Sequence, residues 1–585
     1  MKYFYKTFLL FIVTFTISFS QNFNDIGLRK HLEILASDLF NGRKPGDLGC
    51  DLAADYIKNT FQNIGLNPIS GKYEQVFEVV NKVLLLDRNK LIFRNKEFIV
   101  EKDFIPLSFT SNTSVKSEVV FADYGLLINE NDFKWNSYKN LDVRGKWVMM
   151  LVGDPENDKD DSRFSKYSTL RLKSILAKDK GAIGVIFVQG KKITKKDELL
   201  PITFDKSESK VDIAVINITR QLANEIISNY SNYNIEEIEL LIDSLREPIN
   251  FQIPEKVFAH TNIDLEKVQT KNVIGMINSD SDNYVVIGAH YDHLGLGGLN
   301  SGSRLPDTVA VHNGADDNAS GVIGVIRLAE MYLTNKKILK NNIVFVAFSS
   351  EEMGSLGSKY FIKSKIIPPE KIKFMVNLDM IGRLKEDNSV IIGGTGTAAE
   401  FNEVIDKLAL TTNLKIVKSP EGFGASDHSS FYSENIPVLF FTTGAHEDYH
   451  RPTDDVEKIN FLGLEKVIDF IYKVTDYLQN NYNKLAFQLS GPQVRRGGAR
   501  YKVTLGFMPD FTNTSDFGVL VGGVTYNSPA YIGGLRKGDR IIAIDGKKTK
   551  DIYEYMARLN ELEPGQQITV DILRNGEKVI LIVQL

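Results

Sequence analysis

Hydrophobic positions divide the chain into segments of different periodicity. Residues 24–66 carry apolar side chains at helical spacing, in two runs separated by the polar, turn-rich stretch NGRKPGDLG. Residues 76–106 are strand-like, with the apolar runs VFEVV, VLLL and FIV. Between about 110 and 250, short β-like runs alternate with polar loops, which predicts a separate mixed β module.

Residues 272–480 alternate apolar strand candidates with helical runs. The strand candidates are NVIGMI, NYVVIGAH, NIVFVAFS, KFMVNLDM, SVIIGG and PVLFF, and the longest helical run is INFLGLEKVIDFIYKVTDYLQN. Continuously apolar strands need cover on both faces, so this region predicts an α/β fold with a mostly parallel sheet flanked by helices. A polar linker, SGPQVRRGGAR, then precedes a last module at 500–585.

Length, charge and cysteine content narrow the class of protein. The 585 residues are 43% hydrophobic, which suits several folded domains and excludes disorder as the overall state. Lys plus Arg number 70 against 74 Asp plus Glu, so the net charge of −4 offers no basic surface for nucleic acid. The single cysteine, Cys50, excludes an internal disulfide framework and a thiolate metal cluster.

The first twenty residues have the pattern of a secretory signal peptide. Lys2 and Lys6 precede an apolar stretch, and Ser18 and Ser20 provide small residues before a cut at Gln21. The alternative is a transmembrane anchor, which the short, threonine-interrupted run disfavours. We therefore expect an exported protein, periplasmic or secreted, without a stable membrane anchor.

Candidate metal ligands follow the predicted strands. His290 and Asp292 follow one strand, and Glu351 and Glu352 follow a second. The rest of the set comprises Asp379 at the end of a third strand, Asp316 and Asp317 in the loop NGADDNASG, and His450 after PVLFF. Because the carboxyl ends of strands border the binding crevice of an open α/β sheet, we expect these side chains to converge. Imidazole and carboxylate donors without sulfur suit Zn²⁺, and can suit Mn²⁺ or Co²⁺.

A two-metal site would explain the size of this set. Two adjacent metals need a bridging carboxylate and several terminal ligands. One further carboxylate must stay free of metal to accept a proton from water, and the Glu351-Glu352 pair offers one residue for each role. Any one of these short motifs is common on surface loops, and only their joint placement favours a site. Residue type alone leaves open the choices between His290 and His293 and between Asp316 and Asp317.

Six segments occur in family-like order and spacing: GAHYDHLG, GADDNASG, SSEEMGSLGS, NLDMIGR, ASDHSSF and YHRPTDD. They resemble the secreted bacterial leucine aminopeptidases and their glutamate carboxypeptidase II and transferrin-receptor relatives, the co-catalytic dizinc exopeptidases. The resemblance covers about 270–480, and LASDLFNGRKPGDLGCDLAADYI resembles the opening helices of the same domain. It implies a zinc exopeptidase domain in two parts, 21–109 and 251–485, interrupted by an insert.

The resemblance implies a set of metal ligands for two zinc ions per chain. His290 and Asp379 would be terminal ligands of one zinc, Glu352 and His450 terminal ligands of the other, and Asp317 would bridge both.

Roles beside the metals are implied in the same way. Glu351 would be the general base and later the acid, and Asp292 would orient the His290 imidazole. Asp427 and His428 match a motif near the site in this family, which implies a substrate-side or a structural role. The remaining histidines of this region are expected to be structural: His293, His312 and His446.

The implied activity is that of an exported metallo-exopeptidase, an aminopeptidase that hydrolyses N-terminal residues of peptides with a hydroxide held by two zincs. A carboxypeptidase or dipeptidase of the same family is the alternative. The single-zinc glutaminyl cyclase branch is disfavoured by the ligand set. A non-catalytic peptide-binding scaffold is disfavoured because every ligand and Glu351 are present.

Two further modules carry weaker resemblances. Residues 110–250 look like a protease-associated domain, from the KWVMMLVGD and KGAIGVIFVQ segments; in relatives this domain lies beside the active site and restricts access. Residues 500–585, after a linker at 486–499, resemble a PDZ domain in which Leu505, Gly506 and Phe507 match the carboxylate-binding loop. Such a groove binds the C-terminus of a peptide; the alternative is a PDZ fold used for packing or assembly.

Overall fold

The computed structural model describes residues 27–585 except 131–132, 157–161, 206, 300, 336–338, 425, 483–484, 491–502, 510–516, 525–527 and 551. The predicted signal peptide at 1–20 and most of the predicted linker lie outside the described residues. No helix in the described part of the chain combines the length and apolarity needed to cross a membrane. The chain forms two structural units, one of Met1–Val79 with Val268–Gln493 and one of Val80–Lys267 with Val494–Leu585.

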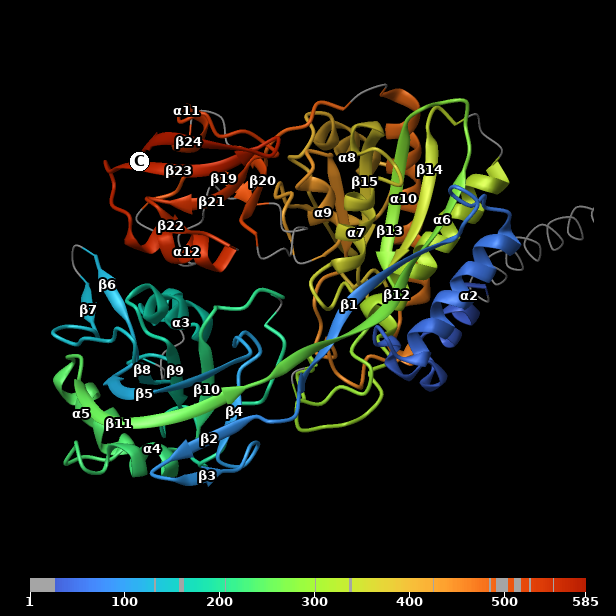
Figure 1. The fold of residues 1–585 in the computed structure, drawn as a ribbon. Coiled ribbons are helices and arrows are strands. Elements are labelled where there is room, and N and C mark those ends of the chain that lie inside the picture. The colour runs from blue at the N-terminus through green and yellow to red at the C-terminus, as the bar shows by residue number, and fades with distance from the viewer. Residues whose placement is uncertain are drawn as a thin grey trace, which may run out of the picture. The chain divides into compact units, whose positions relative to one another are not determined.

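The first unit is built on an eight-stranded sheet with the order β1-β12-β14-β13-β15-β18-β16-β17 (Figure 1). The strands are β1 (Glu74–Leu85), β12 (Ile263–Ile277), β13 (Tyr284–His290), β14 (Asn342–Phe348), β15 (Ile372–Leu378), β16 (Ser389–Gly393), β17 (Lys415–Lys418) and β18 (Val438–Thr442). β13 runs parallel to β14 and β15, and β15 runs parallel to β18. β12 and β16 run antiparallel to β14 and β18. The predicted α/β class is confirmed, and the carboxyl ends of the four central strands share one edge.

Helices cover both faces of this sheet, which explains its continuously apolar strands. The helices in the described part of the unit include residues 27–35 and α2 (Leu48–Ile64), α6 (Gly321–Asn335), α7 (Leu356–Ser364), α8 (Phe401–Ala409), α9 (His428–Tyr432) and α10 (Phe461–Asn481). In β13, Val285 and Ile287 belong to the core cluster shared with α2, α6, α8 and α10. Val286 points to the opposite face and belongs to the cluster shared with α7 and α9.

The second unit contains the predicted insert, which forms an eight-stranded sheet in the order β3-β2-β11-β5-β8-β9-β10-β4. Its strands are β2 (Lys90–Phe93), β3 (Lys96–Phe98), β4 (Phe104–Pro106), β5 (Thr113–Ala122), β8 (Trp147–Leu151), β9 (Gly184–Val188), β10 (Ala214–Ile218) and β11 (Asn250–Thr261). A hairpin of β6 (Leu127–Asn129) and β7 (Lys134–Asn136) and the helices α3 (Leu170–Asp179), α4 (Arg220–Ile227) and α5 (Ile235–Leu245) complete it.

The insert is wider than the range of 110–250 predicted from hydrophobic texture. β11 pairs with β2 on one side and with β5 on the other, so residues 90–106 and 250–261 belong to this sheet. Strand periodicity reveals which face of a strand is buried, but not which of two sheets the strand joins.

The C-terminal module also lies in the second unit. Its sheet has the order β19-β20-β21-β23-β24, with β22 paired to β21. The elements are β19 (Phe507–Pro509), β20 (Val519–Val524), β21 (Arg540–Ile544), β22 (Lys547–Lys548), β23 (Gln567–Arg574), β24 (Glu577–Gln584), α11 (Pro529–Ile532) and α12 (Ile552–Glu561). The module has a hydrophobic core of its own, as a separately folded domain requires.

Candidate metal centre

The predicted ligands meet at the carboxyl edge of the central sheet. His290 is the last residue of β13, and Asp379 directly follows β15. Glu352 follows β14, Asp317 precedes α6, and His450 lies in the loop after β18. Their side chains are between 2% and 16% exposed. Segments far apart in the sequence therefore place five potential ligands in one nearly buried cluster.

The first donor group contains His290, Asp317 and Asp379. Nε2 of His290 lies 3.4 Å from Oδ1 of Asp317 and 3.6 Å from Oδ1 of Asp379. In a tetrahedral zinc site with bonds of about 2.0–2.1 Å, neighbouring ligand atoms are about 3.3 Å apart. The donor spacing therefore fits a zinc ion with nitrogen and oxygen ligands.

The second donor group uses the other oxygen of Asp317. Nε2 of His450 lies 3.3 Å from Oδ2 of Asp317 and 3.2 Å from Oε2 of Glu352. One carboxylate thus offers one oxygen to each group, which is the arrangement that a metal-bridging ligand needs. The residues present fit two zinc ions.

His293 also lies in this second group, together with Asp317 and Glu352. Its Nδ1 is 2.8 Å from Oε1 of Glu352 and 3.9 Å from Oδ2 of Asp317. A structural role was expected for His293 from the sequence. The structure places it against a candidate ligand, so the second group contains two imidazoles, and the position of Glu352 depends on both.

Glu351 lies beside the donor groups and in neither of them. Its Oε2 is 4.0 Å from Nε2 of His290, and its Oε1 accepts a hydrogen bond of 3.3 Å from the Ser355 hydroxyl. Burial raises the pKa of Glu351 well above its usual range; His290 opposes this shift and Glu352 adds to it. Glu351 is therefore the carboxyl of the cluster best placed to carry a proton.

The neighbouring Glu352 is shifted in the opposite direction. Burial and the charge of Asp317 favour its neutral form, but hydrogen bonds from His293 and His450 prevail and lower its pKa to about 2. The pKa values of two adjacent carboxyls of the same type are thus shifted in opposite directions because their surroundings differ.

Asp292 fixes the direction of both glutamates. Its Oδ1 accepts the backbone N–H of Glu351 at 3.0 Å, and its Oδ2 accepts that of Glu352 at 3.4 Å. Toward His290, the Asp292 carboxylate lies 3.7 Å from Nδ1, whereas the carbonyl of Asp292 lies 3.1 Å from the same nitrogen. A proton on Nδ1, donated to this carbonyl, leaves Nε2 free to bind a metal.

The hydrogen bonds of Asp316 and Asp317 indicate which of the two is the candidate metal ligand. Oδ1 of Asp316 accepts the N–H of Gly382 at 2.6 Å, and its Oδ2 lies 3.2 Å from Nε2 of His446. Asp454, which sequence analysis did not assign, accepts the backbone N–H groups of Asp316 and Asp317 at 2.9 and 3.0 Å. Asp316 and His446 thus support the loop, and Asp317 faces both donor groups. Asp454 lies in the motif YHRPTDD, and this motif was the sequence signal that could have identified it.

Arg43 is a second residue that sequence analysis did not single out. It is 1% exposed, and its guanidinium donates to the carbonyls of Leu35, Tyr291, Asn313 and Gly314 at 2.6 to 3.0 Å. Tyr291 lies between His290 and Asp292, and Gly314 precedes the Asp316-Asp317 loop. Arg43 therefore ties the N-terminal segment to two ligand-bearing loops. It lies in NGRKPGDLG, whose polar pattern indicates a surface turn.

The other candidate residues are also buried. Burial raises the pKa of Asp427 to about 7, against the charge of His290. The His428 ring stacks on Phe440 with centroids 4.6 Å apart, and burial lowers its pKa to about 3. Nδ1 of His312 lies 2.9 Å from the Ala310 carbonyl and its Nε2 2.8 Å from the Ser303 hydroxyl, as expected for a structural histidine.

The three residues of the predicted carboxylate loop lie at the start of the C-terminal module. The carbonyl of Leu505 accepts the N–H of Ala530 at 2.7 Å, and that of Gly506 accepts the Ser528 hydroxyl at 2.9 Å. The φ of Gly506 is 77°, a conformation that favours glycine. The Phe507 ring meets Tyr555 of α12 edge to face, with centroids 5.0 Å apart.

Comparisons with known proteins agree with these features. Residues 272–475 match the model of peptidase family M28, and residues 498–585 match the PDZ domain model. A probable leucine aminopeptidase of Trichophyton verrucosum is 34% identical over 181 residues; the match covers 30% of this chain, and the chain spans about half (46%) of that relative's length. Leucine aminopeptidase 1 of Sclerotinia sclerotiorum is 25% identical over 338 residues, covering 55% of this chain and 81% of the relative.

Among solved structures, an aminopeptidase from Aneurinibacillus sp. strain AM-1 aligns with a TM-score of 0.48 and 19% identity, over 79% of this chain and 96% of that chain. The family assignment depends on the two domain models and on the ligand-bearing motifs, all of which lie within the matched ranges. Residues 272–475 of this chain are a peptidase family M28 domain, and residues 498–585 are a PDZ domain.

Proposed function

We propose that this chain is an exported metallo-exopeptidase that removes N-terminal residues from peptides with two zinc ions. The observation that carries the proposal is the position of Asp317, whose two oxygens face two separate donor groups. The relatives named leucine aminopeptidases support the choice of an aminopeptidase. The signal-peptide pattern of residues 1–20 supports export to a periplasm or to the medium.

In this proposal each zinc has its own ligands. His290 and Asp379 would hold the first, Glu352 and His450 would hold the second, and Asp317 would be shared by both. When bound, the two ions polarise the scissile carbonyl and lower the pKa of the attacking water.

The residues of the chain move the proton. Glu351, outside both donor groups, accepts the proton of the water and then delivers it to the leaving amine nitrogen. Asp292 keeps Glu351 in place through the backbone N–H that it accepts. We assign Asp427, which is buried and whose charge raises the pKa of Glu351, to the surroundings of the base. We assign His428, stacked on Phe440, a structural role.

For the PDZ domain we propose binding of a peptide C-terminus at Leu505, Gly506 and Phe507. The left-handed backbone conformation of Gly506 and the contact of Phe507 with α12 support a loop at the end of a groove between β19 and α12.

The test is the substitution Glu351→Gln, with Glu386→Gln on an exposed loop as the matched control. The purified variants are analysed for zinc content and assayed on aminoacyl amides, on dipeptides, and on peptides blocked at either end, with and without a chelator. We expect Glu351→Gln to keep two zincs per chain and to lose about 10²–10⁴-fold in turnover, the range for a general acid–base group. Activity near that of the control would refute the assignment of the base. Cleavage of N-terminally blocked but not C-terminally blocked peptides would show that the protein is a carboxypeptidase and not an aminopeptidase.

A further inference from the structure

Helix α12 of the PDZ domain has two different faces. Tyr555 and Leu559 point into the hydrophobic core of the PDZ domain, and the Tyr555 ring contacts Phe507 of the predicted carboxylate loop. Glu554, Ala557 and Arg558 lie at positions i, i+3 and i+4 and so share a face of the helix. This second face is not needed for the PDZ core.

The second face binds helix α3 of the insert, within the same structural unit. Both terminal nitrogens of Arg558, Nη1 and Nη2, donate to the carboxylate of Asp179, and the longer contact is 3.2 Å. Nζ of Lys178 lies 2.6 Å from Oε1 of Glu554. Lys550, just before α12, pairs with Asp212 of the insert. These three pairs each join opposite charges of the two domains.

Burial distinguishes this interface from an incidental surface contact. Arg558 and Glu554 are each only 2% exposed. A buried charge is tolerated only when partners compensate for its lost hydration, and the insert provides the oppositely charged partner of each residue. Ala557, between them, packs against a hydrophobic cluster of the insert, as does Leu176 of α3.

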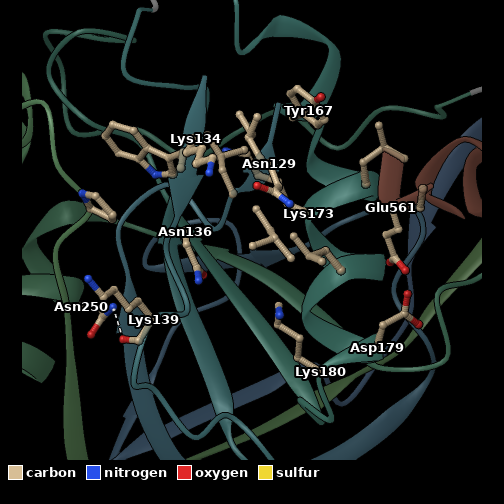
Figure 2. Close-up of a pocket in the computed structure, with 18 of the residues that line it drawn as sticks. Asn129, Lys134, Asn136, Lys139, Tyr167, Lys173, Asp179, Lys180, Asn250 and Glu561 are labelled. Atoms are coloured by element: carbon tan, nitrogen blue, oxygen red, sulfur yellow. Dashed lines mark hydrogen bonds between the residues drawn. The ribbon is translucent and has the colours of Figure 1, made fainter. Parts of the chain in front are cut away.

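A cleft of about 1100 Å³ lies beside the interface and is lined by both domains. Figure 2 shows Asp179 and Glu561 next to each other on one wall, with Asn136 and Lys139 across the cleft. The cleft gains one wall from α12, so its shape depends on the docking of this helix.

We infer that α12 is a docking helix that fastens the PDZ domain to the insert of the same chain. The helix that borders the peptide groove is thus also the surface that binds α3. If a peptide C-terminus binds beside α12, as the proposed function states, the peptide and the insert contact opposite faces of the same helix. The PDZ domain is a fixed part of the insert unit rather than a freely tethered module.

The test measures amide hydrogen exchange in the full-length protein after the substitution Asp179→Arg. Asp179 belongs to the insert, so faster exchange in α12 can arise only through the contact. Arg558 is left intact at first because it also donates to the Lys548 carbonyl within the PDZ domain. The matched control is Asp142→Arg, since Asp142 is an exposed aspartate of the insert that pairs locally with Arg144.

We expect exchange across 552–561 to be about tenfold faster or more in Asp179→Arg, because an unpaired buried charge opposes docking. The exchange rate should be unchanged in Asp142→Arg. It should fall again in the double variant Asp179→Arg with Arg558→Asp, in which the two charges of the pair are exchanged. Lys178→Glu, rescued by Glu554→Lys, gives a second and independent measurement if Asp179→Arg does not fold. Unchanged exchange of α12 in the folded single variants would overturn the inference. A rescue that depends on protein concentration would assign the contact to a second copy and overturn it as well.

Discussion

Arg43→Met tests whether a buried guanidinium holds the ligand loops together. Methionine is unbranched and apolar, and it removes the donors to the carbonyls of Leu35, Tyr291, Asn313 and Gly314. A buried carbonyl without a partner costs about 1–3 kcal/mol. The Gly314 carbonyl keeps the N–H of Ala319 at 3.2 Å, so three carbonyls lose their partner. Even at the low end, three such groups give about 3 kcal/mol, because little space is open for water at a residue that is 1% exposed.

The same change should weaken metal binding without touching a ligand. Tyr291 adjoins His290, and Gly314 precedes the loop of Asp317, so the two loops that supply these ligands lose a shared anchor. Substitutions of residues that position metal ligands typically cost 10–100-fold in affinity. We expect a decrease of this size for zinc. Arg43→Lys should be intermediate, because one ammonium group keeps the charge but cannot reach all four carbonyls.

The assay is native-state hydrogen exchange on the metal-free protein, followed over β13 and α6, with zinc affinity measured by competition with a chelator. Following these elements separately avoids assuming that a chain of several domains unfolds in one step. Arg29→Met is the control, since Arg29 is 48% exposed and its nearest carboxylate, on Glu33, is 3.9 Å away. The control should cost less than about 1 kcal/mol. A loss below about 1 kcal/mol for Arg43→Met, with normal zinc affinity, would refute the reasoning.

Three further predictions concern individual carboxylates. Asp317→Ala should lower the zinc content toward zero and abolish activity, because both donor groups lose a shared ligand; elemental analysis showing two zincs would contradict the bridging assignment. Glu352→Gln should weaken one zinc site and leave the other, which a two-step chelator titration can show. Asp448, paired with Lys458 and Arg383, has a pKa lowered to about 2 despite its burial, so its contribution to stability is present above pH 4 and is lost as the pH falls from about 4 to 2. Acid unfolding of Asp448→Asn should lack this pH dependence, and a curve parallel to that of the wild type would contradict the assignment.

The sequence predicted the candidate site residues that lie at the ends of strands. His290, Glu352 and Asp379 come at or just after buried parallel strands, and the carboxyl ends of such strands meet at one edge of the sheet. A linear pattern can therefore predict that these side chains converge. It can also predict the fold class, because strands covered on both faces must be apolar throughout.

Features that depend on distant partners were not predictable in the same way. The pattern of residue types could not choose between Asp316 and Asp317, since that choice depends on hydrogen bonds from Gly382 and to Asp454. The burial of Arg43 depends on carbonyls about 250 to 270 residues away in the chain. The limits of the insert depend on strand pairing across β11, which no local periodicity reveals.

The Glu351-Glu352 pair shows how one short motif acquires two roles. The residues are adjacent and chemically identical, so the sequence provides two carboxyls without distinguishing them. Asp292 accepts both backbone N–H groups and thereby fixes both residues in one turn. Glu352 then lies against two imidazoles, which favour its anion, whereas Glu351 stays buried outside the donor groups, where the neutral form is favoured. Because both residues are glutamates, the difference between them comes from their positions and not from their side chains. The proposed proton transfer therefore depends on the turn at Asp292 as well as on the two acids.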